Sequence, residues 1–95
     1  MLIYLEMIET PEDKDKMDEL YQYYRNLMFS VARKIVGNDK DAEDAVGNAA
    51  VKIIENLEKI SEIKCPKTKS YVVTIVKNKA RDINRWKNRH PQVEI

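Results

Sequence analysis

Chain-breaking residues are scarce in this sequence of 95 residues, which holds two glycines and three prolines. A sandwich or barrel of many short strands needs more sites of chain reversal than that. The breaks fall at Thr10-Pro11, Gly37-Asn38-Asp39 and Cys65-Pro66-Lys67 and divide the chain into four segments. A chain of this length buries roughly 60 per cent of its unfolded surface, enough for one modest core. We therefore predict a single all-α domain over residues 1–95, a compact bundle of three main helices plus a short N-terminal segment.

The first main helix is predicted to begin at Pro11 and to stop before Gly37. Thr10 is the expected N-cap, Pro11 suits the first helical position, and Gly37 supplies the stop. Between them, apolar residues recur at steps of three and four and form one stripe: Met17, Leu20, Tyr21, Tyr24, Leu27, Met28, Val31, Ala32, Ile35 and Val36. Tyrosine and methionine at helical spacing belong to a core far more often than to a ligand site, so we interpret the stripe as core.

A second main helix is predicted from near Asp39 to Leu57. Its apolar stripe begins with small residues and ends with large ones, which lets neighbouring helices approach closely: Ala42, Ala45, Val46, Ala49, Ala50, Ile53, Ile54 and Leu57. Asp39 and Asp41 complement the positive end of the helix. Asp44 lies one turn further in, where a partner surface and a solvated acid are both compatible with the pattern. A calcium loop is rejected because it needs glycine where Asp44 stands.

A third main helix is predicted from Ser70 to about Arg89. The run Val72-Val73-Thr74-Ile75-Val76 has high strand propensity, but only the short N-terminal segment could pair with it. The helical step is kept over four turns by Val72, Ile75, Val76, Ala80, Ile83 and Trp86 or Lys87. Periodicity therefore favours a helix.

Charge is segregated along the chain, although the net charge is only +1. Residues 1–62 hold eight Lys and Arg against fourteen Asp and Glu, whereas residues 63–95 hold nine against two. The polar side of the last helix carries cations interleaved with amides: Thr74, Lys77, Asn78, Arg81, Arg85 and Asn88. Lysine and arginine neutralise phosphates, and asparagine hydrogen-bonds base edges, so this face is predicted to bind nucleic acid. The alternative is a solvated, charged helix face.

Residues that carry covalent or metal chemistry are few. Cys65 and His90 are the single cysteine and histidine, so neither an intramolecular disulfide nor a familiar zinc spacing can be written. There is no glycine-rich phosphate loop and no convergent nucleophile and base. The apolar run Leu2-Ile3-Tyr4-Leu5 is too short to span a membrane, and we see no export signal. We predict a cytoplasmic protein that is not an enzyme, with no catalytic residue, no metal, no cofactor and no membrane contact.

Four stretches of the chain carry a family resemblance. They are Leu20-Tyr21-Gln22-Tyr23-Tyr24-Arg25-Asn26-Leu27-Met28, Asp41-Ala42-Glu43-Asp44-Ala45-Val46, Cys65-Pro66-Lys67-Thr68-Lys69-Ser70-Tyr71 and Ile75-Val76-Lys77-Asn78-Lys79-Ala80-Arg81-Asp82. In these stretches the chain resembles domain two of the bacterial ECF (extracytoplasmic function) sigma factors. The specific element is the combination of an Ala-Glu-Asp helix start with a later helix of the pattern Ile-x-x-Asn-x-x-x-Asp.

The resemblance implies a transcription initiation factor domain with two binding faces. One face docks on the coiled coil of the largest RNA polymerase subunit, and the positions that match are Asp41, Glu43, Asp44, Gly47 and Asn48. The other face recognises and melts the promoter minus-ten element. There the loop from about Ser61 to Ser70 captures a base flipped out of the non-template strand. The DNA-binding positions implied are Lys67, Lys69, Ser70, Thr74, Lys77, Asn78, Arg81 and Arg85. An anti-sigma factor is an expected partner, and no covalent chemistry is implied.

The sequence departs from the family pattern at three points. Gly47 stands where the family usually has Gln, Glu or His, and Ala50 stands where it has a large apolar residue. The helix-turn-helix domain that normally follows is absent from this chain, so we expect a truncated protein. The alternative function is a small helical interaction module that binds a transcription partner without reading DNA.

Overall fold

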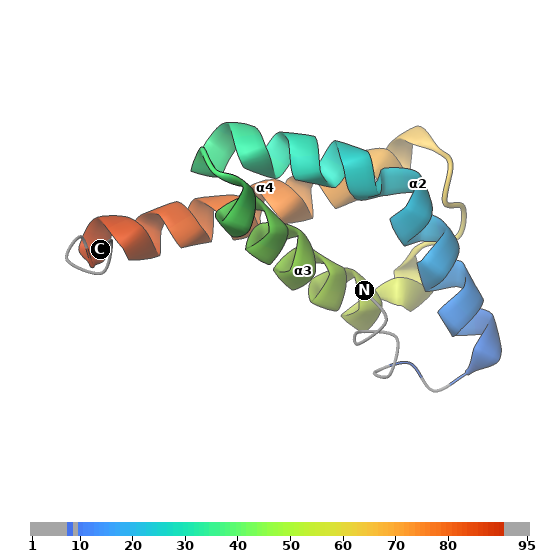
Figure 1. Ribbon diagram of the computed structural model, residues 1–95. Coiled ribbons are helices and arrows are strands. Elements are labelled where there is room, and N and C mark those ends of the chain that lie inside the picture. The colour runs from blue at the N-terminus through green and yellow to red at the C-terminus, as the bar shows by residue number, and fades with distance from the viewer. Residues whose placement is uncertain (1–7, 9, 91–95) are drawn as a thin grey trace.

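Three long helices surround one core in the computed structural model, which describes residue 8 and residues 10–90 (Figure 1). The helices are α2 (Pro11–Val36), α3 (Asp39–Glu55) and α4 (Pro66–Arg89), and a short 3₁₀ turn, η1 (Leu57–Lys59), follows α3. No strand occurs in this part of the chain. The predicted all-α bundle is confirmed. The N-terminal run, residues 2–5, lies outside the described residues.

Both ends of α2 lie where the sequence predicts them. The Thr10 hydroxyl accepts a hydrogen bond from the backbone N–H of Asp13 at 3.2 Å, and Pro11 occupies the first turn. At the other end, Gly37 adopts a left-handed conformation with φ of 84°, and its N–H donates to the Arg33 carbonyl at 3.0 Å. Glycine adopts this conformation without steric cost, so it ends the helix cleanly.

The predicted end of α3 is two residues too late. The helix ends at Glu55, because the N–H of Asn56 turns back to the carbonyl of Ile53 and the chain tightens into η1. Leu57 therefore lies in the 3₁₀ turn, although it is buried at 4 per cent exposure as the apolar stripe predicts. The start of α3 is capped by Asn38, whose Oδ1 accepts from the N–H of Asp41 at 2.9 Å.

The predicted start of α4 at Ser70 is wrong, because the helix begins one turn earlier at Pro66. Cys65 is the N-cap residue, and its carbonyl accepts from the N–H of Lys69 at 3.0 Å. Proline is favourable at the first helical position, where no N–H is needed, so Pro66 begins the helix rather than breaking the chain. The loop predicted to extend to Ser70 therefore ends at Cys65. The β-branched run that follows is helical, as its periodicity predicts.

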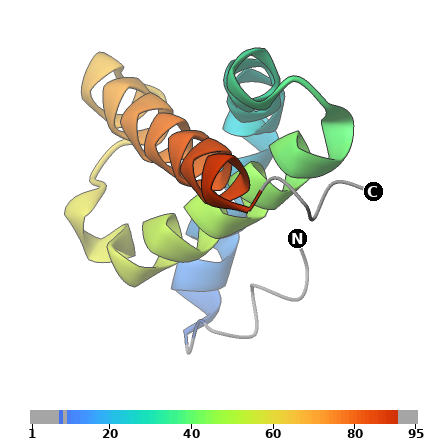
Figure 2. The same cartoon turned by 90° about the vertical axis from the view of Figure 1, so that its left-hand side faces the viewer.

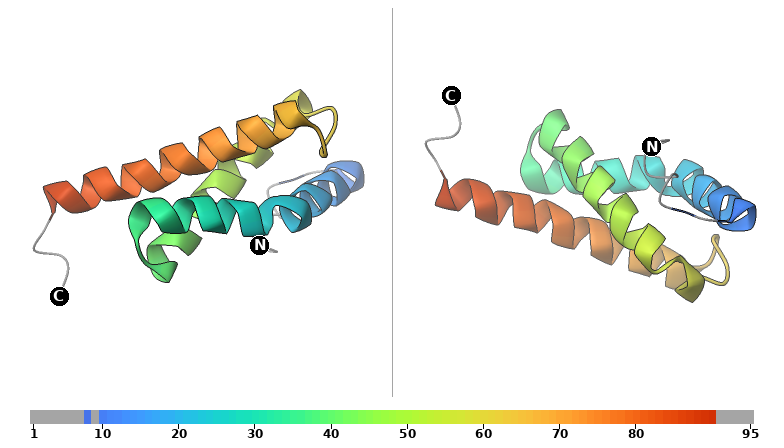
Figure 3. Two further views of the ribbon diagram at one scale, coloured as in Figure 1. Left: turned by 90° about the horizontal axis from the view of Figure 1, so that it is seen from above. Right: turned by 90° about the horizontal axis from the view of Figure 1, so that it is seen from below.

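The core lies where the three helices meet. Figure 3 shows α2 and α4 lying side by side, with α3 crossing both. The buried side of α3 consists mostly of alanine, with two larger residues, and each side chain is at most 6 per cent exposed: Ala42, Ala45, Val46, Ala49, Ala50 and Ile53. Larger residues of the other two helices pack against them and are fully buried: Met17, Leu20, Met28, Val72 and Val76. Ala50 is itself fully buried, so the neighbouring residues pack closely at the position where the family usually has a large apolar residue.

The C-terminal turns of α4 extend beyond the other two helices, as Figure 1 shows, and Figure 2 views α4 nearly along its axis. None of the described helices contains an apolar stretch long enough to cross a membrane.

Candidate functional site

The predicted DNA-binding residues all lie on α4, and the side chains of all eight are exposed: Lys67, Lys69, Ser70, Thr74, Lys77, Asn78, Arg81 and Arg85. They lie away from the positions that α4 buries in the core. Arg85 pairs with Asp82 at 3.0 Å, but both side chains are about 60 per cent exposed, so solvent screens this pair. Lys77 and Arg81 have no ion pair within the described residues. The face is positive and open to solvent.

A cavity of about 290 Å³ lies beside the first turns of α4. Its lining combines an aromatic ring, two lysines, hydroxyls and a thiol: Lys59, Ile60, Ser61, Cys65, Lys67, Thr68 and Tyr71. We call it the loop cavity. Its lining includes part of the predicted base-binding loop and the predicted DNA-binding residue Lys67. Lys59, Ile60 and Tyr71 also line it, and the sequence analysis did not predict them as site residues. The signal for Tyr71 was present in the sequence, because a helix that begins at Pro66 places Lys67 and Tyr71 one turn apart on one side.

The loop that borders this cavity, residues 60–65, is held from two helices. Tyr24 of α2 donates its hydroxyl hydrogen to the carbonyl of Ile63 at 2.6 Å, and Thr68 of α4 donates to the carbonyl of Glu62. Burial raises the pKa of Tyr24, so this phenol keeps its proton for the bond. Lys16 adds a bond to the carbonyl of Leu57 at 3.0 Å, just before the loop. The loop therefore has a fixed position relative to the exposed face of α4.

Cys65 lies at the junction between this loop and α4. Its Sγ is 3.4 Å from the Thr68 hydroxyl and 3.4 Å from the Glu62 carbonyl, and the side chain is half-buried. The Thr68 hydroxyl, together with the backbone N–H groups of Thr68 and Lys67, holds the pKa of the thiol below its usual range. The single thiol of the chain is thus part of the cavity wall.

A second, larger recess lies between the start of α3 and the end of α4. It has a volume of about 530 Å³ and is lined by Asn38, Lys40, Asp41, Asp44, Ile83, Trp86, Lys87 and His90. We call it the α3–α4 groove. Of the predicted polymerase-binding residues, Asp41 and Asp44 line this groove. Glu43 and Asn48 are exposed elsewhere on α3, and Gly47 is half-buried.

Asp41 is occupied by contacts within the protein. Its Oδ2 accepts from Asn38 Nδ2 at 2.9 Å and from Lys87 Nζ at 2.7 Å, and its side chain is 14 per cent exposed. The Asn38 amide and the Lys87 ammonium hold the pKa of this carboxyl below its usual value. A second bond holds the same end of α4, since Asn84 of α4 donates to the carbonyl of Ile35 of α2 at 2.8 Å. Asp41 therefore joins the start of α3 to the end of α4 and offers little surface to a partner.

Residues 20–90 match the family described as Sigma-70 region 2, and this range contains α3, α4, the loop cavity and the α3–α4 groove. Since the match covers most of the chain, the protein belongs to this family. No curated protein and no solved structure gives a significant match. Sigma-70 region 2 is the part of a sigma factor that docks on RNA polymerase and recognises the promoter minus-ten element. It is a non-enzymatic transcription factor domain.

The Asp41 contacts predict a specific dependence of stability on pH. A carboxyl whose pKa is lowered in the folded state stabilises the fold above its unfolded pKa, and this contribution is lost as pH falls through the folded pKa. We expect Asp41→Asn to lower the free energy of unfolding at pH 7 by about 1 to 2 kcal/mol. The deficit relative to the wild type should disappear in acid. Urea unfolding followed by circular dichroism at several pH values measures both quantities.

Asp39→Asn is the matched control for this prediction. Asp39 pairs with Arg33 at 2.8 Å, but their side chains are 79 and 46 per cent exposed. Such a pair contributes little, so the control should unfold almost like the wild type at every pH. Equal losses in the two variants, or a loss for Asp41→Asn that does not change with pH, would contradict the assignment.

Proposed function

We propose that the loop cavity and the exposed face of α4 together bind the non-template single strand of the minus-ten element, and that this region 2 domain is of the ECF type. The observation that carries the proposal is their adjacency. One helix begins at the cavity with Lys67 and Tyr71 and continues with an open row of cations and amides. A single strand can therefore place one base in the cavity while its backbone follows the helix.

The row on α4 is suited to a phosphate backbone. Lys77, Arg81 and Arg85 are spaced by four residues, which places them on one side of the helix at axial steps of about 6 Å. Thr74 and Asn78 lie among these cations and supply a hydroxyl and an amide for contacts to bases. We expect the cations to set the affinity and Asn78 to contribute sequence preference.

The loop cavity is suited to a single unpaired base. The Tyr71 ring can stack on a base, and Lys59, Lys67 and Ser61 can donate hydrogen bonds to its edge. Extruding a base from a duplex costs a few kcal/mol, which these contacts and phosphate neutralisation offset. Because Tyr24 and Thr68 fix the loop before DNA arrives, little ordering of the protein is needed on binding. Melting then follows from binding, without covalent chemistry.

For the polymerase face, we propose docking of α3 on the coiled coil of the largest subunit. Asp44 is an exposed carboxylate with no ion pair in the described part of the chain, and Glu43 and Asn48 are exposed on the same helix outside the groove. Asp41 has a structural part in this face, because its bonds to Asn38 and Lys87 hold the start of α3 in place. An anti-sigma factor is a further proposed partner, and the proposed location is the cytoplasm, where polymerase acts.

The DNA proposal predicts two distinguishable kinds of mutant. Lys77→Ala and Arg81→Ala should weaken binding to all single strands alike, and each should make the log-log dependence on salt shallower by about 0.7. Asn78→Ala should reduce the preference for minus-ten-like sequences and leave the salt slope nearly unchanged. Fluorescence anisotropy titrations of labelled oligonucleotides at several salt concentrations measure both properties.

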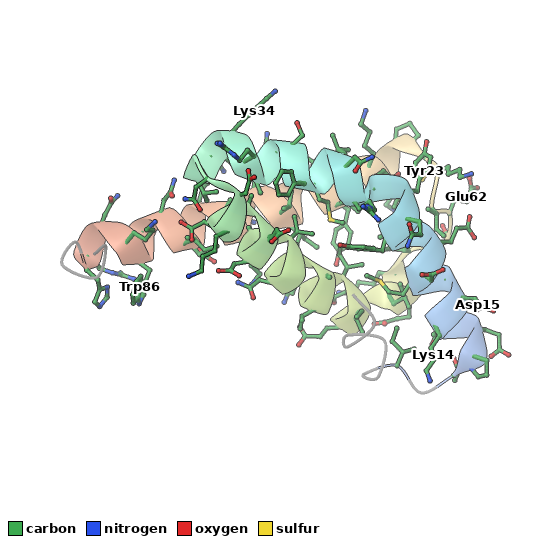
Figure 4. All side chains as sticks on the ribbon, in the orientation of Figure 1. Lys14, Asp15, Tyr23, Lys34, Glu62 and Trp86 are labelled. Atoms are coloured by element: carbon green, nitrogen blue, oxygen red, sulfur yellow. The ribbon has the colours of Figure 1, made fainter. Side chains whose placement is uncertain are left out.

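Lys14→Ala is the matched control, because Lys14 is an exposed lysine in the first turns of α2, as Figure 4 shows, and belongs neither to α4 nor to the lining of the loop cavity. It should change neither affinity nor salt slope. Polymerase normally raises the effective concentration of this domain at the promoter, so a fusion to a coiled-coil fragment should be titrated as well. If neither the domain at low salt nor the fusion binds any single strand, the DNA proposal is wrong.

The docking proposal predicts that Asp44→Lys weakens binding to the polymerase coiled coil and leaves the fold intact. The reason is that the reversed charge removes an exposed contact, while Asp39 and Asp41 still support the start of α3. Asp18→Lys, the same change at an exposed position on α2, should have no effect on docking. Titration against the isolated coiled coil measures the affinity, and circular dichroism checks the fold. Wild-type affinity for Asp44→Lys would refute the assignment, and a melted variant would show that Asp44 is structural.

A further inference from the structure

Trp86 is the most unusual side chain of the α3–α4 groove. It is 46 per cent exposed, and Tyr23 is the only other large hydrophobic residue with such exposure in the described part of the chain. Figure 4 shows Trp86 near the end of α4, well apart from Tyr23. Its ring stacks on His90 with centroids 4.3 Å apart at 18°, and His90 Nδ1 lies 2.8 Å from the Trp86 carbonyl. The indole is thus held in place rather than buried, as a binding residue would be.

The opposite wall of the groove carries the carboxylates of α3. Asp41 is occupied by Asn38 and Lys87, whereas Asp44 has no ion pair among the described residues. The groove therefore places an available carboxylate across from an exposed indole. Lys40 lies on the same wall and limits how much positive charge an occupant can bring. The four charged residues of the groove, two lysines and two aspartates, sum to zero, so an occupant with one cation can pair locally with Asp44 but the groove has no net negative charge to hold more.

An arginine side chain fits both walls better than a lysine does. A guanidinium is planar, so it can pair with a carboxylate through its N–H groups and stack a face on an aromatic ring. An ammonium forms a salt bridge as a point charge and cannot stack. Tryptophan is also the strongest aromatic partner for a cation.

The docking face on α3 gains from such an addition because none of its predicted docking residues has a large apolar side chain. Gly47 has no side chain, Ala50 is fully buried, and Asn48 is polar. Binding energy at protein interfaces is concentrated in a few residues, among which tryptophan and arginine are enriched. Charge on α3 alone would provide steering without an anchor. Trp86 is the exposed aromatic residue that shares a groove with Asp44.

We propose that the polymerase-docking surface continues from α3 onto the end of α4, and that the α3–α4 groove holds one arginine of the polymerase coiled coil between Asp44 and Trp86. This inference rests on the proposed docking of α3. It assigns the groove side of the last turns of α4, which carries Trp86, to polymerase and leaves the exposed face that ends at Arg85 to DNA.

The test is a titration of the full chain against the polymerase coiled coil. We expect Trp86→Ala to weaken docking about tenfold or more, as loss of an interface hot spot does. Trp86→Phe, which keeps a ring, should lose less than Trp86→Leu, which keeps only apolar volume. Tyr23→Ala, the other exposed aromatic, is the matched control and should dock like the wild type. On the partner, one Arg→Lys change should weaken docking of the wild type and have a much smaller effect when the domain carries Trp86→Leu.

The outcomes distinguish failure of the Trp86 contact from failure of the proposed docking through α3. If Asp44→Lys weakens docking and Trp86→Ala does not, the extension onto α4 is wrong and docking through α3 stands. If neither change matters, docking through this face is wrong altogether. Weaker binding of Trp86→Ala to single-stranded DNA, with docking unchanged, would assign Trp86 to the DNA face and overturn the inference. Unfolding midpoints equal to the wild type establish that each variant is folded.

Discussion

The alanines on the buried side of α3 determine how closely the three helices approach. Ala42, Ala45, Ala49 and Ala50 are all fully buried, and without larger side chains between them the helix backbones can lie near one another. This closeness places the start of α3 against the end of α4, where Asp41 and Lys87 meet at 2.7 Å across 46 residues of sequence. It also places η1 and the loop that follows against the start of α4. Both proposed binding regions depend on this packing.

Each part of α4 has a different neighbour, as the proposal of two partners for this helix requires. Its first turns border the loop cavity, its middle presents cations to solvent, and its last turns line the groove shared with α3. Of the four charged residues that line the α3–α4 groove, Asp41 and Lys87 pair with each other. The segregation of charge in the sequence matches the order of the helices, because the acidic residues 1–62 contain α2 and α3 and the basic residues 63–95 contain α4. A region 2 domain docks on polymerase and recognises promoter DNA, and the proposal assigns these two contacts to α3 and α4.

Local rules predicted most of the fold from the sequence. Thr10, Pro11 and Gly37 act through hydrogen bonds and backbone angles within a few residues, so the ends of α2 were predictable. The start of α4 was also predictable in principle, but Pro66 was interpreted as a break although it has the same role as Pro11.

Features that depend on distant parts of the chain could not be predicted. The bond from Tyr24 to the loop carbonyl of Ile63, and the pairing of Asp41 with Lys87, join residues far apart in sequence. Cavities arise only once such contacts exist, which is why Lys59 was missed. The helical spacing predicted that Trp86 or Lys87 continues the apolar stripe of α4. Because α4 extends beyond the other two helices at this point, the Trp86 ring is exposed instead.

The central claim, that a base of single-stranded DNA enters the loop cavity, is tested most directly at Cys65. It is the only cysteine of the chain and part of the cavity wall, so its rate of alkylation reports on whether the cavity is occupied. The rate should fall in proportion to the fraction of protein bound when a minus-ten-like oligonucleotide is added. An abasic site at the position of the flipped base should abolish most of this protection while leaving backbone binding. An unchanged alkylation rate under conditions where anisotropy shows the oligonucleotide to be bound would contradict the account.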